Sequence, residues 1–304
     1  MKAVLDTRFH DLEQFMQEVH HWDLDFRVMD TGGFQGRLKQ LVSENMLVSY
    51  ARFQRGLDQA GATPPGFRTF AILGKACNGF WWRGHPVTHN DLLAFPPSNE
   101  LQSFSRRDFE VFTVSLRESC LVQLVNDLGI PFNPTCKREV IPLEPGAIQE
   151  LRTLAGMIVS TTNAVAASAI SQVLAERLLV YANTGTSGKR TSMRKRDLAV
   201  DRVREYVRSV PAPVSELAGL CRIAGVSERT LQYAFRERYG ISPNVYIRRW
   251  KLNTARRQLL QADPADATVN GIAMDLGFHH QGQFAADYRK LFLETPSMTL
   301  VSRQ

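Results

Sequence analysis

Four polar side chains that can hydrogen-bond to the edges of bases fall on one face of a predicted helix near residue 230. Apolar residues recur there at helical spacing, so Leu231, Ala234 and Phe235 turn inward and leave the polar residues outward. An Arg side chain can bind guanine through two hydrogen bonds, and a Gln side chain can bind adenine in the same way. The outward residues are Arg229, Gln232, Tyr233 and Arg236. A solvated polar face without a ligand is the alternative.

The turn before this helix has a counterpart later in the chain. Cys221 and Gly225 stand four residues apart, and so do Ala273 and Gly277. A helix-turn-helix crosses two short helices at a steep angle, so the first helix needs a small residue at the crossing. The tight turn then needs a Gly, which tolerates positive φ, and Ser227 suits the N-cap of the next helix. We therefore predict two helix-turn-helix units with these four turn residues, and two ordinary helical hairpins are the alternative.

The second unit offers a weaker set of base-reading residues. An inward stripe leaves Gln281 and Gln283 near the predicted groove, and it consists of Phe284, Tyr288, Leu291 and Phe292. Cations around both units are candidates for phosphate contacts, which fix position without reading sequence, and a solvated charge is the alternative for each. These cations are Arg248, Arg249, Arg256, Arg257, Arg289 and Lys290.

A long helix is predicted between the two units. Ser242 and Pro243 form an N-cap followed by Pro at the first helical position, and the helical pattern continues through Leu260. A helix of about 18 residues is roughly 27 Å long. It can set two recognition helices about one DNA turn, roughly 34 Å, apart.

The charge of the chain agrees with a polyanion partner for its last third. Residues 185–304 contain 20 Lys and Arg against 11 Asp and Glu, whereas the first 184 residues contain 17 against 19. A basic segment beside a near-neutral remainder is typical of nucleic-acid binding. Cys77, Cys120, Cys136 and Cys221 are scattered, which indicates reduced thiols rather than disulfides or a zinc site. We see no secretory leader and no run near the roughly 20 apolar residues of a membrane span, so we expect a cytoplasmic protein.

Residues 203–300 resemble the DNA-binding domain of AraC/XylS-type bacterial transcriptional regulators. The resemblance is carried by Gly-Val-Ser-Glu-Arg-Thr-Leu at 225–231, Gly-Ile-Ser-Pro at 240–243, Arg-Arg-Gln-Leu-Leu at 256–260 and Ala-Met-Asp-Leu-Gly-Phe at 273–278. Within the family, residues 277–288 are similar to the branch that contains the ethanolamine-operon regulator. The chain departs from the family at Leu293, where Gly is usual, and at Asp287, which would repel a phosphate if it faced DNA.

This resemblance implies a sequence-specific transcription factor. Its implied partners are double-stranded DNA and RNA polymerase, its implied effect is activation, and its implied base-reading positions include Arg229, Gln232 and Tyr233. It also implies an N-terminal cupin-like sensor domain for a small-molecule effector, with no cofactor and no enzymatic activity. Two alternatives are a regulator controlled by its abundance or by a partner protein, and a metal-cupin enzyme with a DNA-binding tail.

The first two thirds of the chain have the pattern of a small β-barrel or sandwich with flanking helices. Short apolar runs at 38–42, 46–53, 68–73 and 110–116 lie between Gly and Pro turns. Helices are predicted within residues 1–25, 115–128 and 147–180, and the last of these forms either core packing or a homodimer interface. Trp81, Trp82 and Phe95 suit either an aromatic core or a ligand pocket, and His85 with His89 gives only a fragment of a metal site.

We therefore expect an α+β protein with two domains. Residues 1–182 form the β-rich sensor and dimerisation domain, and residues 183–196, which are polar and basic, form a flexible linker. Residues 197–304 form the all-α domain, in which a long helix joins the two helix-turn-helix units.

Overall fold

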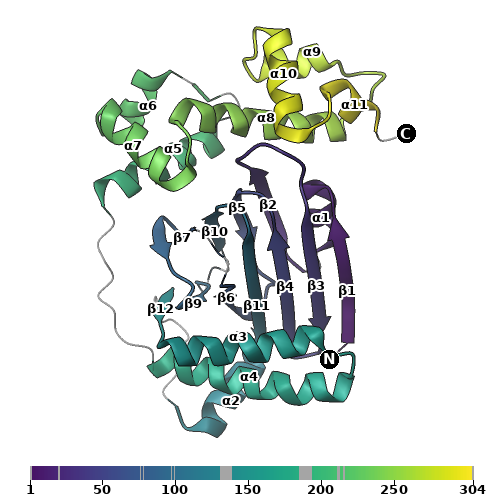
Figure 1. Cartoon of the computed structure of the whole chain (residues 1–304), viewed down its shortest axis with the longest axis vertical. Coiled ribbons are helices and arrows are strands. Elements are labelled where there is room, and N and C mark those ends of the chain that lie inside the picture. Colours follow the sequence, from purple (N-terminus) through teal and green to yellow (C-terminus); the bar gives the residue numbers. More distant parts are fainter. Residues whose placement is uncertain are drawn as a thin grey trace. The chain divides into compact units, whose positions relative to one another are not determined.

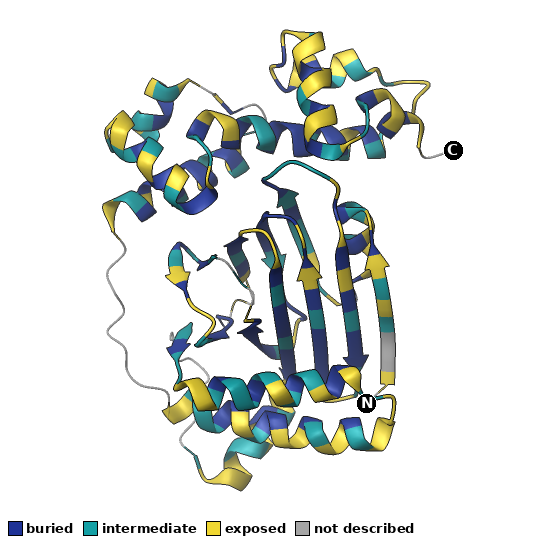
Figure 2. Ribbon diagram, viewed as in Figure 1, coloured by how far each residue is buried: buried dark blue, intermediate teal, exposed yellow. Residues whose placement is uncertain are grey.

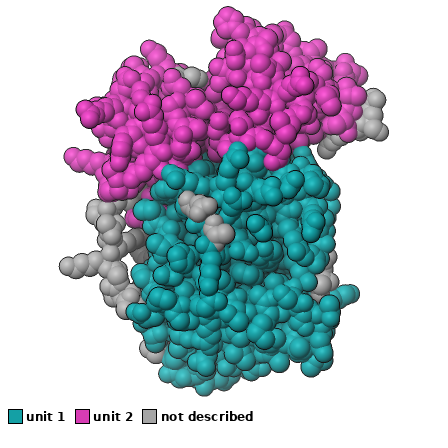
Figure 3. Space-filling model, viewed as in Figure 1, with its two compact units in different colours: residues 1–26, 34–82, 86–191 teal, residues 27–33, 83–85, 192–304 magenta. Residues whose placement is uncertain are grey.

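The structure is a computed structural model that describes residues 2–19, 21–75, 77, 79–96, 98, 100–130, 139–184, 194–210, 213–214 and 216–302. The chain divides into two compact units, which Figure 3 shows in different colours. The first unit contains Met1–Phe26, Phe34–Trp82 and Pro86–Thr191. The second contains Arg27–Gly33, Arg83–His85 and Ser192–Gln304. The expected linker, 183–196, has residues 185–193 outside the described part of the chain.

Two β-sheets form the first unit (Figure 1). The seven-stranded sheet has the order β1-β3-β4-β11-β6-β9-β12, and the five-stranded sheet has the order β2-β5-β10-β7-β8. The first sheet consists of β1 (Lys2–Phe9), β3 (Gly36–Val42), β4 (Met46–Phe53), β11 (Phe109–Arg117), β6 (Phe67–Leu73), β9 (Asp91–Ala94) and β12 (Val140–Pro142). The second consists of β2 (Asp23–Val28), β5 (Leu57–Ala62), β10 (Glu100–Ser105), β7 (Phe80–Trp82) and β8 (His85–Val87). The four strands that the apolar runs predict are confirmed as β3, β4, β6 and β11.

The central strands of the seven-stranded sheet are largely buried on both faces. Successive side chains of a strand point to opposite faces, so β4 places Met46 and Val48 on one side and Ser49 and Ala51 on the other. The first pair joins a hydrophobic core beneath two helices, and the second pair lines a cavity against the five-stranded sheet. Figure 2 shows these strands as largely buried. This two-sided burial explains why the strands appear in the sequence as apolar runs rather than as a strict alternation.

Four helices complete the first unit: α1 (Leu12–Glu18), α2 (Glu118–Leu128), α3 (Pro145–Ser160) and α4 (Ala164–Thr184). Leu151 of α3 and Leu178 of α4 are fully buried in the core beneath the sheet. α4 is also the one helix in the described residues whose length and composition would suit a membrane span, contrary to the expectation from the sequence. The core helix of a soluble protein passes the same test, and α4 contributes to the core, so its length and composition do not establish a membrane span.

The second unit is helical. Its helices are α5 (Lys195–Ser209), α6 (Leu217–Ala224), α7 (Glu228–Tyr239), α8 (Pro243–Gln261), α9 (Val269–Asp275), α10 (Gln281–Phe292) and α11 (Pro296–Val301). The long helix predicted from Ser242 is confirmed as α8, and Ser242 caps it by accepting the Val245 N–H at 3.4 Å. The pairs α6–α7 and α9–α10 are the two helix-turn-helix units.

The N-terminal segment differs from the prediction. Residues 1–25 are predicted as helical, but Lys2–Phe9 is strand β1 and the helix is confined to Leu12–Glu18. β1 is an edge strand that pairs only with β3 in its sheet. An edge strand has one neighbour and is partly exposed, which weakens the apolar pattern that identifies a central strand.

Candidate nucleic-acid interface

The predicted Gly closes the turn of the first helix-turn-helix unit, α6–α7. Gly225 has φ +66°, and its N–H donates to the Cys221 carbonyl at 2.9 Å. A Cβ on Gly225 would also lie 2.9 Å from Nη1 of Arg202. Ser227 then caps α7 by accepting the Thr230 N–H at 3.4 Å. The left-handed backbone therefore explains the need for Gly at 225, and the cap fixes where α7 begins.

Helix α7 separates its apolar and polar side chains as predicted. Leu231 and Phe235 are fully buried. Of the four candidate base readers, Arg229, Tyr233 and Arg236 are exposed and Gln232 is half-buried. Gln232 donates to the Glu228 carboxylate at 3.0 Å, and the Arg196 guanidinium lies 5.1 Å from the centre of the Tyr233 ring.

The third cation of α7, Arg238, stabilises the fold instead. Arg238 is 2% exposed, and its guanidinium donates to the carboxylate of Asp201 and to the backbone carbonyl of Asp197. A cation held this way inside a domain is expensive to separate from its partners. Arg236 and Arg238 therefore have different environments although they lie two residues apart.

The second helix-turn-helix unit repeats one of the two turn hydrogen bonds of the first. Gly277 has φ +77°, and its N–H donates to the Met274 carbonyl at 2.8 Å. The next N–H, that of Phe278, donates to the Ala273 carbonyl at 2.9 Å, just as the Val226 N–H donates to Cys221 at 3.3 Å. The four-residue spacing thus reflects the carbonyl that closes each turn. Ala273 is fully buried whereas Cys221 is only half-buried. The need for a small residue at the helix crossing is therefore stricter in the second helix-turn-helix unit.

Helix α10 presents a less polar outer face than α7. Of the predicted inward stripe, Phe284, Tyr288 and Leu291 are buried, whereas Phe292 is half-buried. Gln281 is half-buried and donates to the Phe278 carbonyl at 3.4 Å, while Gln283 is exposed and donates to a carboxylate oxygen of its own helix at 3.1 Å. Both Gln side chains lie on the first turn of α10, where a recognition helix meets base edges.

Comparison with known proteins places this architecture in a family. Residues 220–301 match the helix-turn-helix domain family. Over 130 residues the chain is 30% identical to the XylDLEGF operon transcriptional activator 2 of Pseudomonas putida, a match that covers 43% of this chain and 82% of that protein. It is 35% identical to a crystal structure of a probable AraC family transcriptional regulator from Rhodopseudomonas palustris, covering 35% of this chain and 97% of that one with a TM-score of 0.32.

The chain belongs to the AraC/XylS family of transcriptional regulators. It is also 38% identical over 103 residues to the probable thc operon regulatory protein of Rhodococcus erythropolis, where the match covers 34% of this chain and 30% of the relative's length. The narrower resemblance to the ethanolamine-operon branch stays a prediction.

The departure from the AraC/XylS pattern at position 293 has a structural consequence. Leu293 ends α10 with φ +63°, in the left-handed region, as Gly240 ends α7 with φ +71°. A side chain in this conformation is strained, and Gly avoids the strain. Leu293 therefore adopts the same left-handed backbone as Gly240, although Leu is less suited to it.

Three of the predicted phosphate contacts are engaged within the protein. Arg256 is 8% exposed and donates through Nε to Glu294 at 2.9 Å, which differs from the exposed phosphate contact that the sequence predicts. Arg248 pairs with Asp287, which accounts for an acidic residue on α10. Arg249 donates to the backbone carbonyl of Met29 within the same unit. Arg257 is half-buried, whereas Arg289 and Lys290 are exposed on α10.

One cation near α10, Lys251, is not indicated by the sequence pattern. Lys251 of α8 is 8% exposed, forms no ion pair with a described residue, and lies in a hollow with Arg248, His279 and His280. Burial lowers the pKa of its ammonium group. The hollow adjoins the first turn of α10, where the N-cap His280 supplies no side-chain hydrogen bond to the backbone N–H groups. A helix N-terminus and a cation together suit an anion. Position 251 gave no signal in the sequence because a Lys in a long helix normally faces solvent.

Proposed function

We propose that the protein is a cytoplasmic, sequence-specific transcriptional activator that places α7 and α10 in successive major grooves of DNA. The observation that carries the proposal is the outer face of α7, where Arg229, Tyr233 and Arg236 are exposed between buried apolar rows. The relative from Pseudomonas putida is named as a transcriptional activator, which supports activation here. We accordingly propose RNA polymerase as a partner and no enzymatic activity of the chain itself.

We further propose separate roles for the polar residues around the two units. Arg229, Gln232, Tyr233 and Arg236 read bases from α7, and Gln281 and Gln283 add weaker contacts from α10. Exposed Arg289 and Lys290 contact phosphates. Lys251 contacts a phosphate held at the N-terminus of α10, since a buried cation without an acidic partner is stabilised when an anion joins it.

The N-terminal unit supplies regulation in this proposal. Its two sheets enclose an apolar cavity, which suits a small-molecule effector. In the described part of the chain, no group of three or more His, Cys, Asp and Glu side chains could hold a metal ion. Apolar side chains also remain exposed on the outer helices, including Met157 of α3 and Val165 of α4. Gel filtration of the full chain tests whether the protein forms a homodimer.

Footprinting and affinity measurements on the strongest genomic site test the base-reading role. Arg229→Ala and Gln232→Ala should each weaken binding to that site by about 5- to 150-fold, the equivalent of about 1–3 kcal/mol. Binding to random-sequence DNA should change little, because base contacts supply the discrimination. Arg52→Ala, which removes an exposed cation of β4, is the charge-matched control. Equal losses on both DNAs would contradict base reading by α7.

A further inference from the structure

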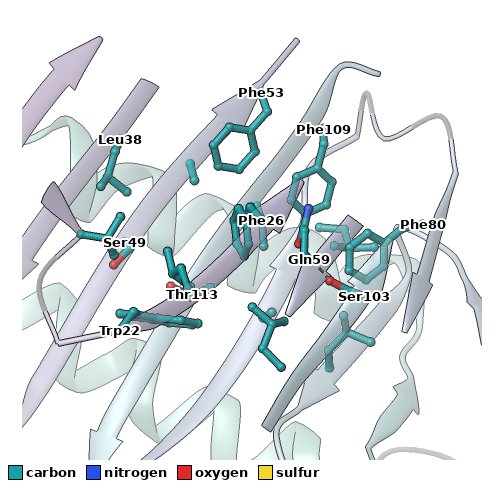
Figure 4. Close-up of a pocket in the computed structure, with 18 of the residues that line it drawn as sticks. Trp22, Phe26, Leu38, Ser49, Phe53, Gln59, Phe80, Ser103, Phe109 and Thr113 are labelled. Atoms are coloured by element: carbon teal, nitrogen blue, oxygen red, sulfur yellow. Dashed lines mark hydrogen bonds between the residues drawn. The ribbon is translucent and has the colours of Figure 1, made fainter. Parts of the chain in front are cut away.

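The cavity of the N-terminal compact unit has an almost wholly apolar lining. It lies between the two sheets, has a volume of about 70 Å³, and is walled by aromatic rings that include Phe26, Phe53, Phe80 and Phe109 (Figure 4). Among the described residues that line it, none carries a charge. An ionised ligand would lose its hydration here without gaining a counter-charge, so the lining favours an uncharged ligand.

Most polar side chains of the lining already bond to protein. Ser103 donates to the side-chain amide oxygen of Gln59 at 2.8 Å (Figure 4). The side-chain amide nitrogen of Gln59 in turn donates to the Ser105 hydroxyl at 3.0 Å. On the other side, Gln40 donates to Ser49 at 3.1 Å. These pairs satisfy one another, so they hold the walls together and attract a ligand only weakly.

Two donors of the lining are different. The indole N–H groups of Trp22 and Trp82 are buried and have no hydrogen-bond partner among the described residues. Both rings line the cavity and pack edge-on against Phe95, with centroids 5.9 Å and 4.7 Å from it. Trp82 is 1% exposed. A buried Tyr or Trp normally finds a partner for its polar group, so these two donors indicate an acceptor that arrives with a ligand.

We propose that the cavity binds an uncharged molecule of about one ring whose hydrogen-bond acceptor receives the indole N–H of Trp82, with Trp22 as the second donor. The volume sets the upper size limit: an apolar cavity of about 150 Å³ holds benzene, so this cavity of about 70 Å³ has to widen by side-chain movement to admit one ring and has no room for a larger ligand. A ketone, ester or ether oxygen on such a ring supplies the acceptor. The proposal rests on the proposed function in that this molecule would be the effector.

Three probes of equal size test the chemistry on the full-length protein. Acetophenone carries a carbonyl acceptor, α-methylstyrene replaces that oxygen by a methylene group, and benzoate is an anion. A ligand that binds only the folded protein raises its melting temperature, and calorimetric titration gives each Kd. We expect acetophenone to bind about 3- to 10-fold more tightly than α-methylstyrene, the ratio that one neutral hydrogen bond supplies. Benzoate should bind more weakly than either.

Tryptophan variants locate the donor. Trp82→Phe keeps an aromatic ring but removes the N–H, so it should abolish the preference for acetophenone and leave the affinity for α-methylstyrene within about twofold. Because Trp82 is buried, its replacement can also loosen the fold, which the melting temperature without ligand reports. Trp22→Phe, at a partly exposed residue, provides a second variant that should reduce the same preference.

The outcomes separate this proposal from the proposed function. Equal affinity for acetophenone and α-methylstyrene would overturn the donor assignment, and tighter binding of benzoate would overturn the uncharged ligand class. Failure of all three probes to raise the melting temperature at 5 mM, about 100 times a Kd of 50 µM, would overturn the proposal as a whole. In each of these cases, footprinting of the same protein without any probe still reports whether it binds DNA specifically.

Discussion

Replacing Lys251 should reduce the salt dependence of DNA binding. Each neutralised phosphate contributes a slope of about −0.9 to a plot of log K against log salt concentration. Lys251→Met keeps most of the buried stem but removes the cation, so the slope should become shallower by about 0.9. Between 50 and 200 mM salt, a fourfold range, the wild-type protein should therefore lose about 3.5-fold more affinity than the variant.

Arg256→Met is the matched control. Arg256 lies on the same helix and is exposed to the same 8% as Lys251, but its guanidinium is paired with Glu294 and lies 5.4 Å from the centre of the Phe292 ring. We expect its salt slope to stay at the wild-type value while the protein loses about 1–3 kcal/mol of stability, since Glu294 is left partly buried without its partner.

Fluorescence anisotropy of a labelled duplex, titrated at several salt concentrations, measures both slopes. An unchanged slope for Lys251→Met, or a shallower slope for a folded Arg256→Met protein, would refute the assignment. The pH supplies a further check, because burial lowers the pKa of Lys251. As pH rises, Lys251 should lose its charge before the exposed lysines do, and the wild-type slope should approach that of Lys251→Met. The bound phosphate opposes this loss by favouring the charged form.

The remaining predictions concern the turns and one thiol. Gly225→Val should destabilise the C-terminal compact unit by about 1–2 kcal/mol in urea unfolding, because φ is +66° at that position. Gly282→Ala, where a Cβ would meet open space within α10, should instead stabilise that unit by about 0.5–1 kcal/mol. Ser227→Ala should lower stability by about 1 kcal/mol through loss of the α7 cap, and Ser227→Asp should retain most of it. Burial raises the pKa of the Cys77 thiol to about 11. Alkylation of Cys77 by iodoacetamide should therefore be slow at neutral pH and accelerate as the pH rises toward about 11. Fast alkylation at about pH 7 would contradict the raised pKa.

The faces of the recognition helices were predictable because their signals are local. The turn at Gly225, the cap at Ser227 and the apolar rows of α7 all occur within about 20 residues of one another. A period of 3.6 residues then decides which side chains turn outward. The strands of the seven-stranded sheet were predictable for a similar reason, since burial on both faces leaves continuous apolar runs.

The partners of the cations were not predictable, because they are tertiary contacts. Arg256 meets Glu294 across 38 residues, and Arg238 meets Asp201 across 37. In sequence, both arginines look like the exposed Arg236. Only the packing of α8 and α7 against other helices decides that two of these side chains stabilise the fold and one remains outward. The apolar cavity was hidden in the same way, since its lining comes from both sheets.

The surroundings of α8 explain how two recognition helices can act as one reader. Near its start, Tyr246 packs against α7, with ring centroids 5.3 Å from Phe235 and 4.6 Å from Tyr239. Near its end, Arg256 binds Glu294 just beyond α10. α8 therefore packs against both helix-turn-helix units rather than lying exposed as a bare connector. In the proposed binding mode, a fixed spacing removes the conformational freedom that a flexible linker would lose on binding, so the second groove would be engaged at a high effective concentration once the first is bound. Modest contacts from α10 can then contribute to affinity although its outer face has few base-reading side chains.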